Sequence, residues 1–545
     1  MSREKMENII VGPELERLID VSLGELLLLT LKAYEDNILQ VDGETNEELT
    51  AGLLLKRAVR LTKWFKNEGI TIGDSISINS ENRLEFCIVP SATFLVGATF
   101  APLNPDYTAR ELKHVLSLSK PKVIFCSPRT IEKMVGILPE HPYIKKLVLF
   151  GKEKSKHKNV IMYQELMEGC EAEAIDESFN ATPVDLKETV ATILCSSGTT
   201  GLPKGVMCTQ DNMTAYIDVA RTLFTEIVFA EDVSDALIGL TPFFHSFGFM
   251  MMFLNIIRGK RMIVLSRFKP KLFLDVLVKY KVSRLIVPPP IYLFLLKHPL
   301  AKQYDLSFIK EMRSGAAPMG KDMERDLKDK FKINHVSQAY GMTETTLGVL
   351  ATPYGEAKIG SCGKVVPGMM AKVISEEGKA LGPYEEGELC FKGVLIMKGY
   401  VGDLEATRNT IDMDGWLHTG DVAYYDNDGY FFIVDRIKEL IKYKAFQVAP
   451  AELEALLLTH PSVQDAAVIG LPNEEAGELP LAFVVKKAGK NITEKEIEKF
   501  VADSVSPQKQ LRGGVIFLKE IPKNPTGKIL RRVLREQAVK MKSKL

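Results

Sequence analysis

Apolar runs of four to six residues alternate with amphipathic segments through most of the chain. The runs at 122–126, 190–195 and 284–287 are rich in β-branched and aromatic residues, which predicts buried strands. The segments 51–67 and 321–330 repeat their apolar residues at the helical spacing, which predicts amphipathic helices. This alternation predicts an α/β fold of layered, largely parallel sheets and helices.

The pattern changes near Arg436, beyond which a new helical segment begins. Pro450 stands at the first turn of that segment, where proline is compatible with a helix, and Leu453 and Leu457 share one face. A chain of 545 residues also exceeds what one hydrophobic core usually supports. We therefore predict an N-terminal domain over 1–434, a hinge over 435–438 and a small, mobile α+β domain over 439–545.

Composition narrows the class of protein. Hydrophobic residues make up 46% and charged residues 26% of the chain, values typical of globular proteins. The formal net charge is zero, so no overall field favours nucleic acid or an anionic membrane as a partner. Seven scattered cysteines, without a CxxC pair or a metal-ligand spacing, predict reduced thiols in an intracellular compartment.

One apolar stretch resembles a membrane helix in composition. Residues 238–257 carry no formal charge. Pro242, His245 and Asn255 interrupt the stretch, however, and polar residues inside a membrane are rare. We therefore expect this stretch to be buried beside a cavity and expect no membrane span.

The chain ends in Ser543-Lys544-Leu545. At a free C-terminus this tripeptide is the address read by the peroxisomal import receptor, and it does not anchor a protein to a membrane. Three residues can also occur together by chance, but their position favours the address. We therefore expect a peroxisomal location.

A loop rich in glycine, serine and threonine follows the predicted strand 190–195. Its glycines allow sharp turns that bring backbone N–H groups against an anion, and Lys204 supplies a charge suited to phosphate. The Walker A pattern is absent, and a loop of this composition alone could be a flexible surface loop. The preceding strand and the closing Pro203-Lys204-Gly205 favour a phosphate-binding loop. Its candidate contacts are Ser196, Ser197, Gly198, Thr199, Thr200, Gly201 and Lys204.

Four further motifs lie downstream of the loop. They read Arg313-Ser-Gly-Ala-Ala-Pro318, Tyr340-Gly-Met-Thr-Glu344, Gly415-Trp-Leu-His-Thr-Gly-Asp421 and Pro525-Thr-Gly-Lys528. Together with the loop they resemble the adenylate-forming superfamily, which contains acyl-CoA synthetases, 4-coumarate-CoA ligases and beetle luciferases. The resemblance implies a large N-terminal domain that binds ATP and a carboxylic acid, and a small mobile C-terminal domain. It also implies activation of the acid through an acyl-adenylate.

The resemblance assigns roles to residues around the nucleotide. Tyr340 would lie on the adenine, and Glu344 would hold Mg²⁺, which prefers carboxylate ligands. Asp421 and Arg436 would bind the ribose. Lys528 would hold the substrate carboxylate against the α-phosphate. The other implied contacts are Gly315, Ala316, Ala317, Gln338, Ala339, Gly341, Met342 and Thr343, of which Thr343 would also act at the phosphate.

The residues expected around the carboxylic acid distinguish between several possible substrates. Where beetle luciferases commonly read TETTSA, this chain has Leu347-Gly348, an apolar wall that would leave buried heteroatoms of luciferin unpaired at about 1–3 kcal/mol each. We therefore expect an acyl-CoA ligase for a medium- to long-chain fatty acid. A luciferase and a 4-coumarate-CoA-like ligase are alternatives, and a catalytically silent sensor or scaffold is disfavoured because the motifs keep their charged residues. The expected pocket contains His245, which would orient the carboxylate, with Phe247, Met250, Met251, Gly315, Leu347 and Gly348.

The step with coenzyme A depends on one segment after the hinge. The family usually reads Y-K-G-[FY]-Q, whereas this chain reads Tyr443-Lys-Ala-Phe-Gln447. If that position needs a positive φ, Ala445 would be strained by about 1–2 kcal/mol. This departure concerns the CoA step and not adenylation. The residues expected to face CoA after the C-terminal domain turns about Lys438 are Lys442, Lys444, Ala445 and Gln447.

Overall fold

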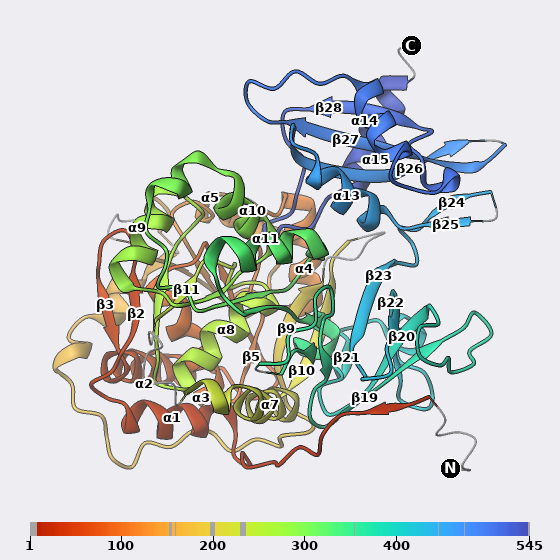
Figure 1. Cartoon of the computed structure of the whole chain (residues 1–545). Coiled ribbons are helices and arrows are strands. Elements are labelled where there is room, and N and C mark those ends of the chain that lie inside the picture. Colours follow the sequence, from red (N-terminus) through yellow and green to blue (C-terminus); the bar gives the residue numbers. More distant parts are fainter. Residues whose placement is uncertain are drawn as a thin grey trace.

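The computed structural model describes residues 8–151, 155–158, 160–196, 202–228, 236–353, 355–444, 446–473 and 475–542. Figure 1 shows a large body with a smaller part, formed by the last hundred or so residues and drawn in blue, above it. The body contains parallel sheets with helices packed on them and an antiparallel sheet, so the predicted α/β class with a small C-terminal part is confirmed.

The largest sheet of the body has eight strands in the order β21-β10-β9-β5-β4-β6-β7-β8. The strands from β9 to β8 pair in parallel, whereas β10 pairs antiparallel with both β9 and β21. The strands predicted at 122–126 and 190–195 are confirmed as β6 and β9. The bounds are β4 Ser75–Asn79, β5 Thr99–Phe100, β6 Val123–Cys126, β7 Lys146–Leu149, β8 Val160–Met162, β9 Val190–Ser196, β10 Lys204–Thr209 and β21 Gly399–Tyr400.

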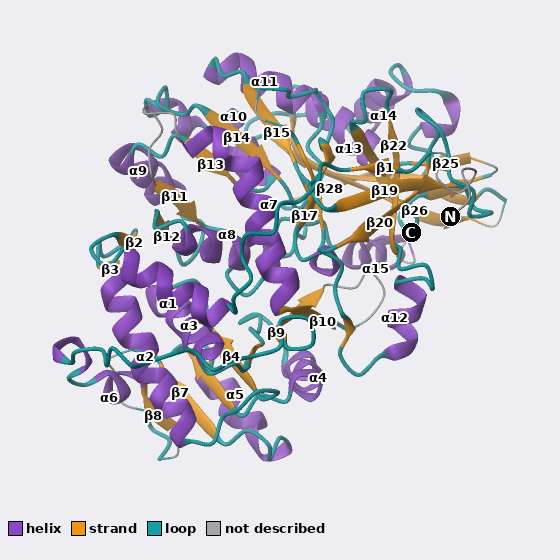
Figure 2. Cartoon of the chain, turned by 90° about the horizontal axis from the view of Figure 1, so that it is seen from below, coloured by secondary structure: helices purple, strands orange, loops and turns teal. Residues whose placement is uncertain are grey.

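Several helices pack beside this sheet around the largest hydrophobic core (Figure 2). The helix predicted at 51–67 is confirmed as α2, and Thr50 caps it by accepting a hydrogen bond from Leu53 N. The stretch 238–257 forms the end of a strand and then α8, whose Phe249 and Phe253 are buried in this core. The bounds are α1 Leu23–Ala33, α2 Ala51–Asn67, α3 Ile88–Leu95, α4 Ala109–Ser119, α5 Ile131–Ile137, α7 Gln210–Val228 and α8 Ser246–Ile257.

Two smaller sheets form a second core. Strands β13, β14 and β15 are parallel, and β11, β12 and β2 are parallel with β3 antiparallel at the edge. Met312 and Leu285 face this core on one side of β13–β14, which leaves Glu311 and Arg313 on the other side. The bounds are β2 Ile38–Asp42, β3 Glu48–Thr50, β11 Ala236–Gly239, β12 Arg261–Val264, α9 Pro270–Tyr280, β13 Arg284–Ile286, α10 Pro289–Lys297, β14 Glu311–Ser314, α11 Lys321–Phe331 and β15 His335–Gln338.

An antiparallel sheet closes the body, so the expectation of largely parallel sheets does not extend to residues beyond about 340. Its order is β1-β19-β20-β22-β23, and the short strands β16, β17 and β18 form a separate antiparallel sheet. The bounds are β1 Ile10–Val11, β16 Tyr340–Gly341, β17 Gly348–Ala351, β18 Lys364–Val365, β19 Met369–Ile374, β20 Gly387–Gly393, α12 Leu404–Thr410, β22 Leu417–Tyr425 and β23 Phe431–Arg436.

The C-terminal part has its own mixed sheet and its own hydrophobic core. The helix predicted after Pro450 is α13, which buries Leu453 and Leu457 on one face. Strands β26 and β27 pair antiparallel, and β27 pairs in parallel with β28. The bounds are β24 Ile441–Tyr443, β25 Phe446–Val448, α13 Pro450–Thr459, β26 Val463–Asn473, β27 Gly477–Lys486, α14 Glu494–Ala502, β28 Gly514–Leu518 and α15 Arg531–Lys542.

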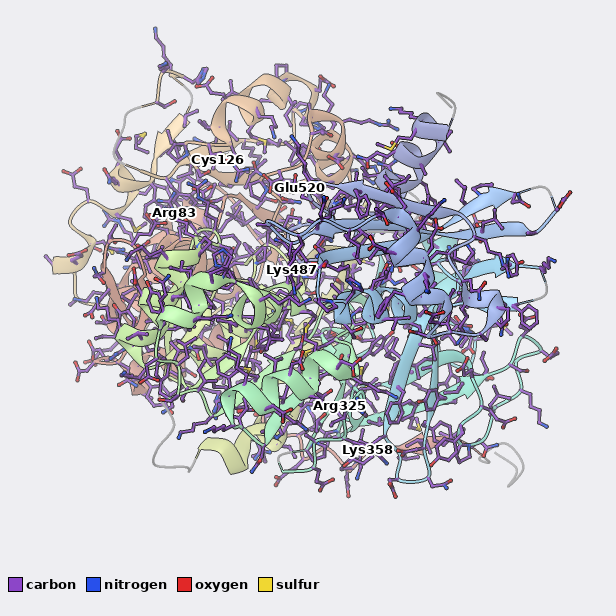
Figure 3. The ribbon with its side chains drawn as sticks, turned by 45° about the horizontal axis from the view of Figure 1, so that its top comes forward. Arg83, Cys126, Arg325, Lys358, Lys487 and Glu520 are labelled. Carbon is purple, nitrogen blue, oxygen red and sulfur yellow. The ribbon has the colours of Figure 1, made fainter. Side chains whose placement is uncertain are left out.

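Hydrogen bonds connect the two parts. Asp435, one residue before the end of β23, accepts from Ala451 N at the start of α13 (2.9 Å), and the Lys297 ammonium of α10 donates to Leu458 O (2.8 Å). Charged side chains such as Arg325 and Glu520 lie on the outside of both parts (Figure 3). In the described part of the chain no helix is both long and apolar enough to cross a bilayer.

Candidate active site

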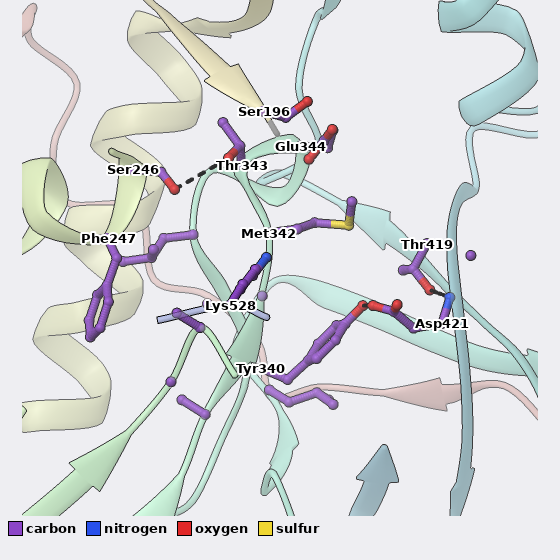
Figure 4. A pocket seen from close by; sticks show the side chains of 18 of the residues that line it. Ser196, Ser246, Phe247, Tyr340, Met342, Thr343, Glu344, Thr419, Asp421 and Lys528 are labelled. Atoms are coloured by element: carbon purple, nitrogen blue, oxygen red, sulfur yellow. Dashed lines mark hydrogen bonds between the residues drawn. The ribbon is translucent and has the colours of Figure 1, made fainter. Parts of the chain in front are cut away.

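A cavity of about 480 Å³ lies where the two parts meet. Strand ends of the body, the start of α8 and Lys528 from the C-terminal part surround it (Figure 4). It brings together residues that are distant in sequence, from Ser196 to Lys528. The predicted site residues that line it are Ser196, Lys204, His245, Phe247, Met251, Gly315, Ala316, Ala339, Tyr340, Gly341, Met342, Thr343, Glu344, Leu347, Gly348, Asp421, Arg436 and Lys528.

Other predicted residues do not line this cavity. Met250 is wholly buried in the core of the body, because consecutive residues of a helix point about 100° apart and Met251 takes the cavity side. Gln338 is buried, and its side-chain oxygen accepts from Met319 N (2.9 Å), which gives it a structural contact. Ala317 lies just beyond the lining residues of its own loop.

The residues expected to face CoA lie away from the cavity. Lys442, Lys444 and Gln447 are exposed on the β24–β25 hairpin, where Lys442 pairs with Gln447 across the strands. None of the three lines the cavity. The predictions for Ser197, Gly198, Thr199, Thr200, Gly201, Ala445 and the terminal tripeptide fall outside the described residues.

One end of the cavity is built around Asp421. The Tyr340 hydroxyl donates to Asp421 Oδ2 (2.5 Å), and Arg436 Nε lies 3.2 Å from Asp421 Oδ1. Asp421 and Arg436 are register partners on β22 and β23, so the backbone itself places the two charges together. Burial raises the pKa of the Asp421 carboxyl, and Arg436 and Tyr340 oppose that rise. The carboxylate is thereby held in a fixed orientation, suited to accept hydrogen bonds from the two hydroxyls of a ribose.

Lys528 enters the cavity on a tight turn of the C-terminal part. The Asn524 side-chain oxygen accepts from Lys528 N (2.9 Å), and Asn524 N donates to Lys528 O (2.8 Å). Gly527 has φ +85°, and a Cβ there would approach Pro290 Cγ to 3.1 Å, so glycine permits both the turn and its contact with α10. Burial and the nearby Arg436 lower the pKa of Lys528, while Asp421 and Glu344 oppose this. The Lys528 ammonium and the carboxylates of Asp421 and Glu344 therefore lie in the same cavity.

Glu344 and Lys204 lie on another side of the cavity. Glu344 Oε1 accepts from the Tyr400 hydroxyl (2.9 Å), and the Lys204 ammonium lies 4.6 Å from the centre of the Tyr400 ring. Thr343 approaches Ser246, with 3.4 Å between their hydroxyl oxygens. A buried carboxylate, a hydroxyl and a lysine fit a Mg²⁺-phosphate group, since Mg²⁺ is commonly bound by one or two carboxylates plus phosphate oxygens. Tyr400 was not predicted, and no local sequence signal distinguishes it from an ordinary core tyrosine.

His245 lies at the N-terminus of α8, where its Nδ1 accepts from Phe247 N (3.4 Å). Burial, together with the positive charge of Lys528, lowers the pKa of His245 to about 3. The imidazole is therefore neutral across the physiological range and can exchange one hydrogen bond with a substrate carboxylate. Its neighbours along the cavity include Phe247, Met251 and Leu347, which are apolar.

The cavity wall also carries a charged side chain that was not predicted as a site residue. Arg313 of β14 lines the cavity beside its register partner Ile286, and its Nε donates to Glu311. Glu311 also pairs with Arg284 (2.7 Å), and its own pKa is lowered by Arg313 and Arg284 against the effect of burial. The alternation Glu311–Arg313 within a short strand is the signal that could have revealed a charged face. The cavity wall therefore contains a charged side chain as well as the apolar Leu347.

Comparison with known proteins agrees with this fold of a large body and a small C-terminal part, and defines a class of enzymes that use ATP. A family model described as AMP-binding enzyme matches residues 30–401, and one described as AMP-binding enzyme C-terminal domain matches 452–528. The luciferin 4-monooxygenase of Photuris pensylvanica is 41% identical over 546 residues, which covers 99% of each chain. The probable 4-coumarate–CoA ligase 3 of Dictyostelium discoideum is 38% identical, covering 94% of this chain and 95% of the relative.

Among solved structures, ATP-bound MatB from Rhodopseudomonas palustris has a TM-score of 0.82 and 27% identity, covering 94% of this chain and 98% of that one. The chain belongs to the AMP-binding enzyme family, and the predicted resemblance is confirmed. Its relatives include both luciferases and CoA ligases, so family membership establishes an ATP-using, AMP-forming enzyme and does not select the acid.

Proposed function

We propose that the chain is an AMP-forming acyl-CoA ligase that uses Mg²⁺, ATP and coenzyme A. In the first step a carboxylate oxygen of the acid attacks the α-phosphorus of ATP, the bond to the β-phosphate breaks, and pyrophosphate leaves. In the second step the CoA thiolate attacks the acyl carbon, the bond to AMP breaks, and acyl-CoA and AMP are released. The observation that supports this most directly is Lys528 lying in one cavity with Glu344, Asp421 and Arg436.

The adenylation step follows from the positions of these groups. Asp421 and Arg436 would hold the ribose, and Lys204 would lie at the outer phosphates. Glu344 would bind Mg²⁺, which would neutralise charge on the departing pyrophosphate, and Thr343 would contact phosphate. The Lys528 ammonium would draw the substrate carboxylate toward the α-phosphorus. The His245 imidazole is neutral, so it would orient the same carboxylate through a hydrogen bond and not through an ion pair.

The CoA step requires a second arrangement of the C-terminal part. Lys442, Lys444 and Gln447 lie on an exposed hairpin, and Lys438 at the junction lines the cavity. We propose that rotation about Lys438 withdraws Lys528 and brings this hairpin to the cavity, so that one cleft serves two reactions in turn. Such a rotation would expose the adenylate to the CoA thiolate.

The lining supports two classes of acid. Phe247, Met251 and Leu347 favour a medium- to long-chain fatty acid, because apolar walls cannot satisfy buried heteroatoms. Arg313 supports a second candidate, an aryl acid with a phenol or another acidic group that a guanidinium could bind. Hydroxycinnamic acids and luciferin both belong to this class, and with luciferin the adenylate could go on to react with O₂ and emit light.

The deciding experiment measures pyrophosphate release with a panel of acids, each with and without CoA. The panel contains alkyl acids of increasing length, hydroxycinnamic acids and luciferin, and light is recorded with the last. A CoA-dependent thioester from alkyl acids supports the fatty acyl-CoA ligase. If the enzyme releases pyrophosphate but forms no thioester with any acid of the panel, the CoA step is overturned. Light from luciferin would support the luciferase. The peroxisomal address at 543–545 stays a prediction, which the location of a fluorescent fusion with and without the tripeptide would test.

A further inference from the structure

Three side chains of different chemistry converge beside the cavity, next to the segment that carries Asp421. Glu388 and Cys390 lie on β20, and His418 lies on the neighbouring strand β22, where it is the register partner of Cys390. One ligand atom from each lies within 4.8 Å of the others. No other triad of histidine, cysteine and acidic side chains this close occurs within the described residues.

The distances match those of a tetrahedral zinc site. With Zn–S of about 2.3 Å and Zn–N of about 2.0 Å, tetrahedral geometry places sulfur and nitrogen about 3.5 Å apart. Cys390 Sγ lies 3.6 Å from His418 Nδ1. Glu388 Oε2 lies 2.9 Å from the same nitrogen, where it forms a hydrogen bond. A metal ion would replace the proton between His418 Nδ1 and Glu388 Oε2, and these two atoms would move apart by a few tenths of an ångström.

The other nitrogen of His418 faces a carboxylate. Its Nε2 lies 3.5 Å from Asp412 Oδ2, and Asp412 Oδ1 is itself held by Trp416 N (2.8 Å). Histidines that bind metals commonly donate their second ring N–H to a carboxylate, which fixes the ring and strengthens the metal bond. Once a metal ion takes the place of the proton on Nδ1, the ring proton lies on Nε2, where Asp412 can accept it.

A metal ion could reach this cluster through the cavity, but it would have to displace the proton of the Cys390 thiol. Cys390 is fully buried, and burial raises the pKa of its thiol, so a metal ion would have to displace a tightly held proton. The side chains of Glu388 and His418 are 22% and 28% exposed, and both line the cavity. A hydrated ion could therefore reach the cluster through the cavity before any nucleotide is bound.

We propose that Glu388, Cys390 and His418 form a binding site for Zn²⁺ and that its occupation inhibits adenylation. The link to the reaction is Glu388, whose Oε1 accepts from Gly420 N (3.1 Å). Gly420 has φ +69° and directly precedes Asp421, so this hydrogen bond holds the segment that presents the candidate ribose ligand. Binding of the Glu388 carboxylate to a metal ion would weaken its hydrogen bond with Gly420 N. The inhibition half of the inference rests on the proposed adenylation, whereas the binding half does not.

The first test measures binding without substrates. Titration with Co²⁺, which commonly occupies zinc sites, is expected to give the near-ultraviolet charge-transfer band of a thiolate–metal bond in the wild-type chain. Zn²⁺ added afterwards should abolish the band. The variant Cys390→Ser should lack it, and His418→Gln should weaken Co²⁺ and Zn²⁺ binding by about tenfold or more. Cys362→Ser, at a buried cysteine that lies in no such cluster, should bind as the wild type does.

The second test measures pyrophosphate release at saturating Mg²⁺ with increasing Zn²⁺. Wild type and Cys362→Ser should be inhibited, and a chelator should restore their activity. Cys390→Ser should keep its activity without zinc and require about tenfold more Zn²⁺ for half inhibition. Equal inhibition of wild type and Cys390→Ser would overturn the proposed inhibition and indicate that Zn²⁺ replaces Mg²⁺ at Glu344. Absence of the thiolate band in a folded wild-type chain, checked by circular dichroism, would overturn the site itself. Absence of pyrophosphate release with every acid would instead contradict the proposed function.

Discussion

The Tyr340 hydroxyl donates a 2.5 Å hydrogen bond to Asp421 Oδ2 across 81 positions of sequence. Tyr340 also lies over Phe391, with ring centroids 6.0 Å apart and planes at 22°, so its hydroxyl is fixed by packing. Arg436 holds the other oxygen of the same carboxylate. Asp421 is therefore oriented by two partners that come from different strands.

This arrangement predicts coupling between Tyr340 and Asp421. Tyr340→Phe removes one hydrogen bond to a charged group, worth about 1.5–3 kcal/mol, and should raise the KM for ATP about tenfold or more. Asp421→Asn should raise it further. Because the two residues share one contact, the double variant should be less impaired than the sum of the single effects. Initial rates at varied ATP concentration provide the measurement, and strictly additive effects would contradict the coupling.

Lys528 is expected to act in adenylation alone. Lys528→Ala should lower the rate of pyrophosphate release by about 10²–10³-fold, because one positioned charge at the transition state is lost. Conversion of a synthetic acyl-adenylate and CoA to the thioester should continue at close to the wild-type rate. Lys519→Ala changes an exposed lysine nearby and serves as the control. Equal losses in both half-reactions would contradict the proposed rotation of the C-terminal part.

The Tyr400 hydroxyl is expected to orient Glu344 as a magnesium ligand. Tyr400→Phe should raise the Mg²⁺ concentration for half-maximal pyrophosphate release about tenfold, the usual effect of losing a partner of a metal ligand. Excess Mg²⁺ should largely restore the rate. Tyr384→Phe, at an exposed tyrosine, should leave the Mg²⁺ dependence unchanged. A rate loss that Mg²⁺ does not relieve would instead point to a role of Tyr400 at Lys204.

The pKa of His245 has a consequence for stability. In the folded chain this pKa is about 3, against an ordinary value of 6.5, so only the unfolded chain takes up the proton between these values. The contribution of His245 to stability is therefore complete above pH 6.5 and is lost as the pH falls, by at most about 1.4 kcal/mol per pH unit. His245→Gln should lose less stability on acidification than the exposed control His298→Gln does, as followed by urea unfolding at pH 7 and pH 5. Parallel losses in both variants would refute this.

Arg313 is expected to influence which acid is activated. Arg313→Met removes a buried guanidinium from the pocket wall and should lower kcat/KM for phenolic acids relative to alkyl acids by about tenfold, the value of one charge-assisted hydrogen bond. Arg325→Met, on the exposed face of α11, is the matched control. Thermal unfolding must accompany the kinetics, because Glu311 would lose one of its partners. An unchanged ratio in a folded variant would exclude Arg313 from substrate selection.

The sequence by itself predicted the elements whose signals are local. The buried strands 122–126 and 190–195 and the helix 51–67 follow from side-chain periodicity. The family resemblance rests on short motifs around Gly341 and Gly420, where backbone geometry limits the choice of residue. A Cβ on Gly341, for example, would lie 1.6 Å from Leu347 O. Such constraints act within a few residues and are therefore visible in the sequence.

Only the tertiary structure decided which side chains meet. Met251 rather than Met250 lines the cavity because helix rotation selects one of two neighbours, and Gln338 is directed away to Met319 N. Arg313, Tyr400 and the Glu388–Cys390–His418 cluster owe their importance to strand register and to packing between distant segments. Strand register pairs residues that are tens of positions apart in the sequence, and the local periodicity of side chains does not encode this pairing. The sequence therefore determined the family, whose members activate a carboxylic acid with ATP, and the place of Arg313 in the cavity wall became apparent only in three dimensions.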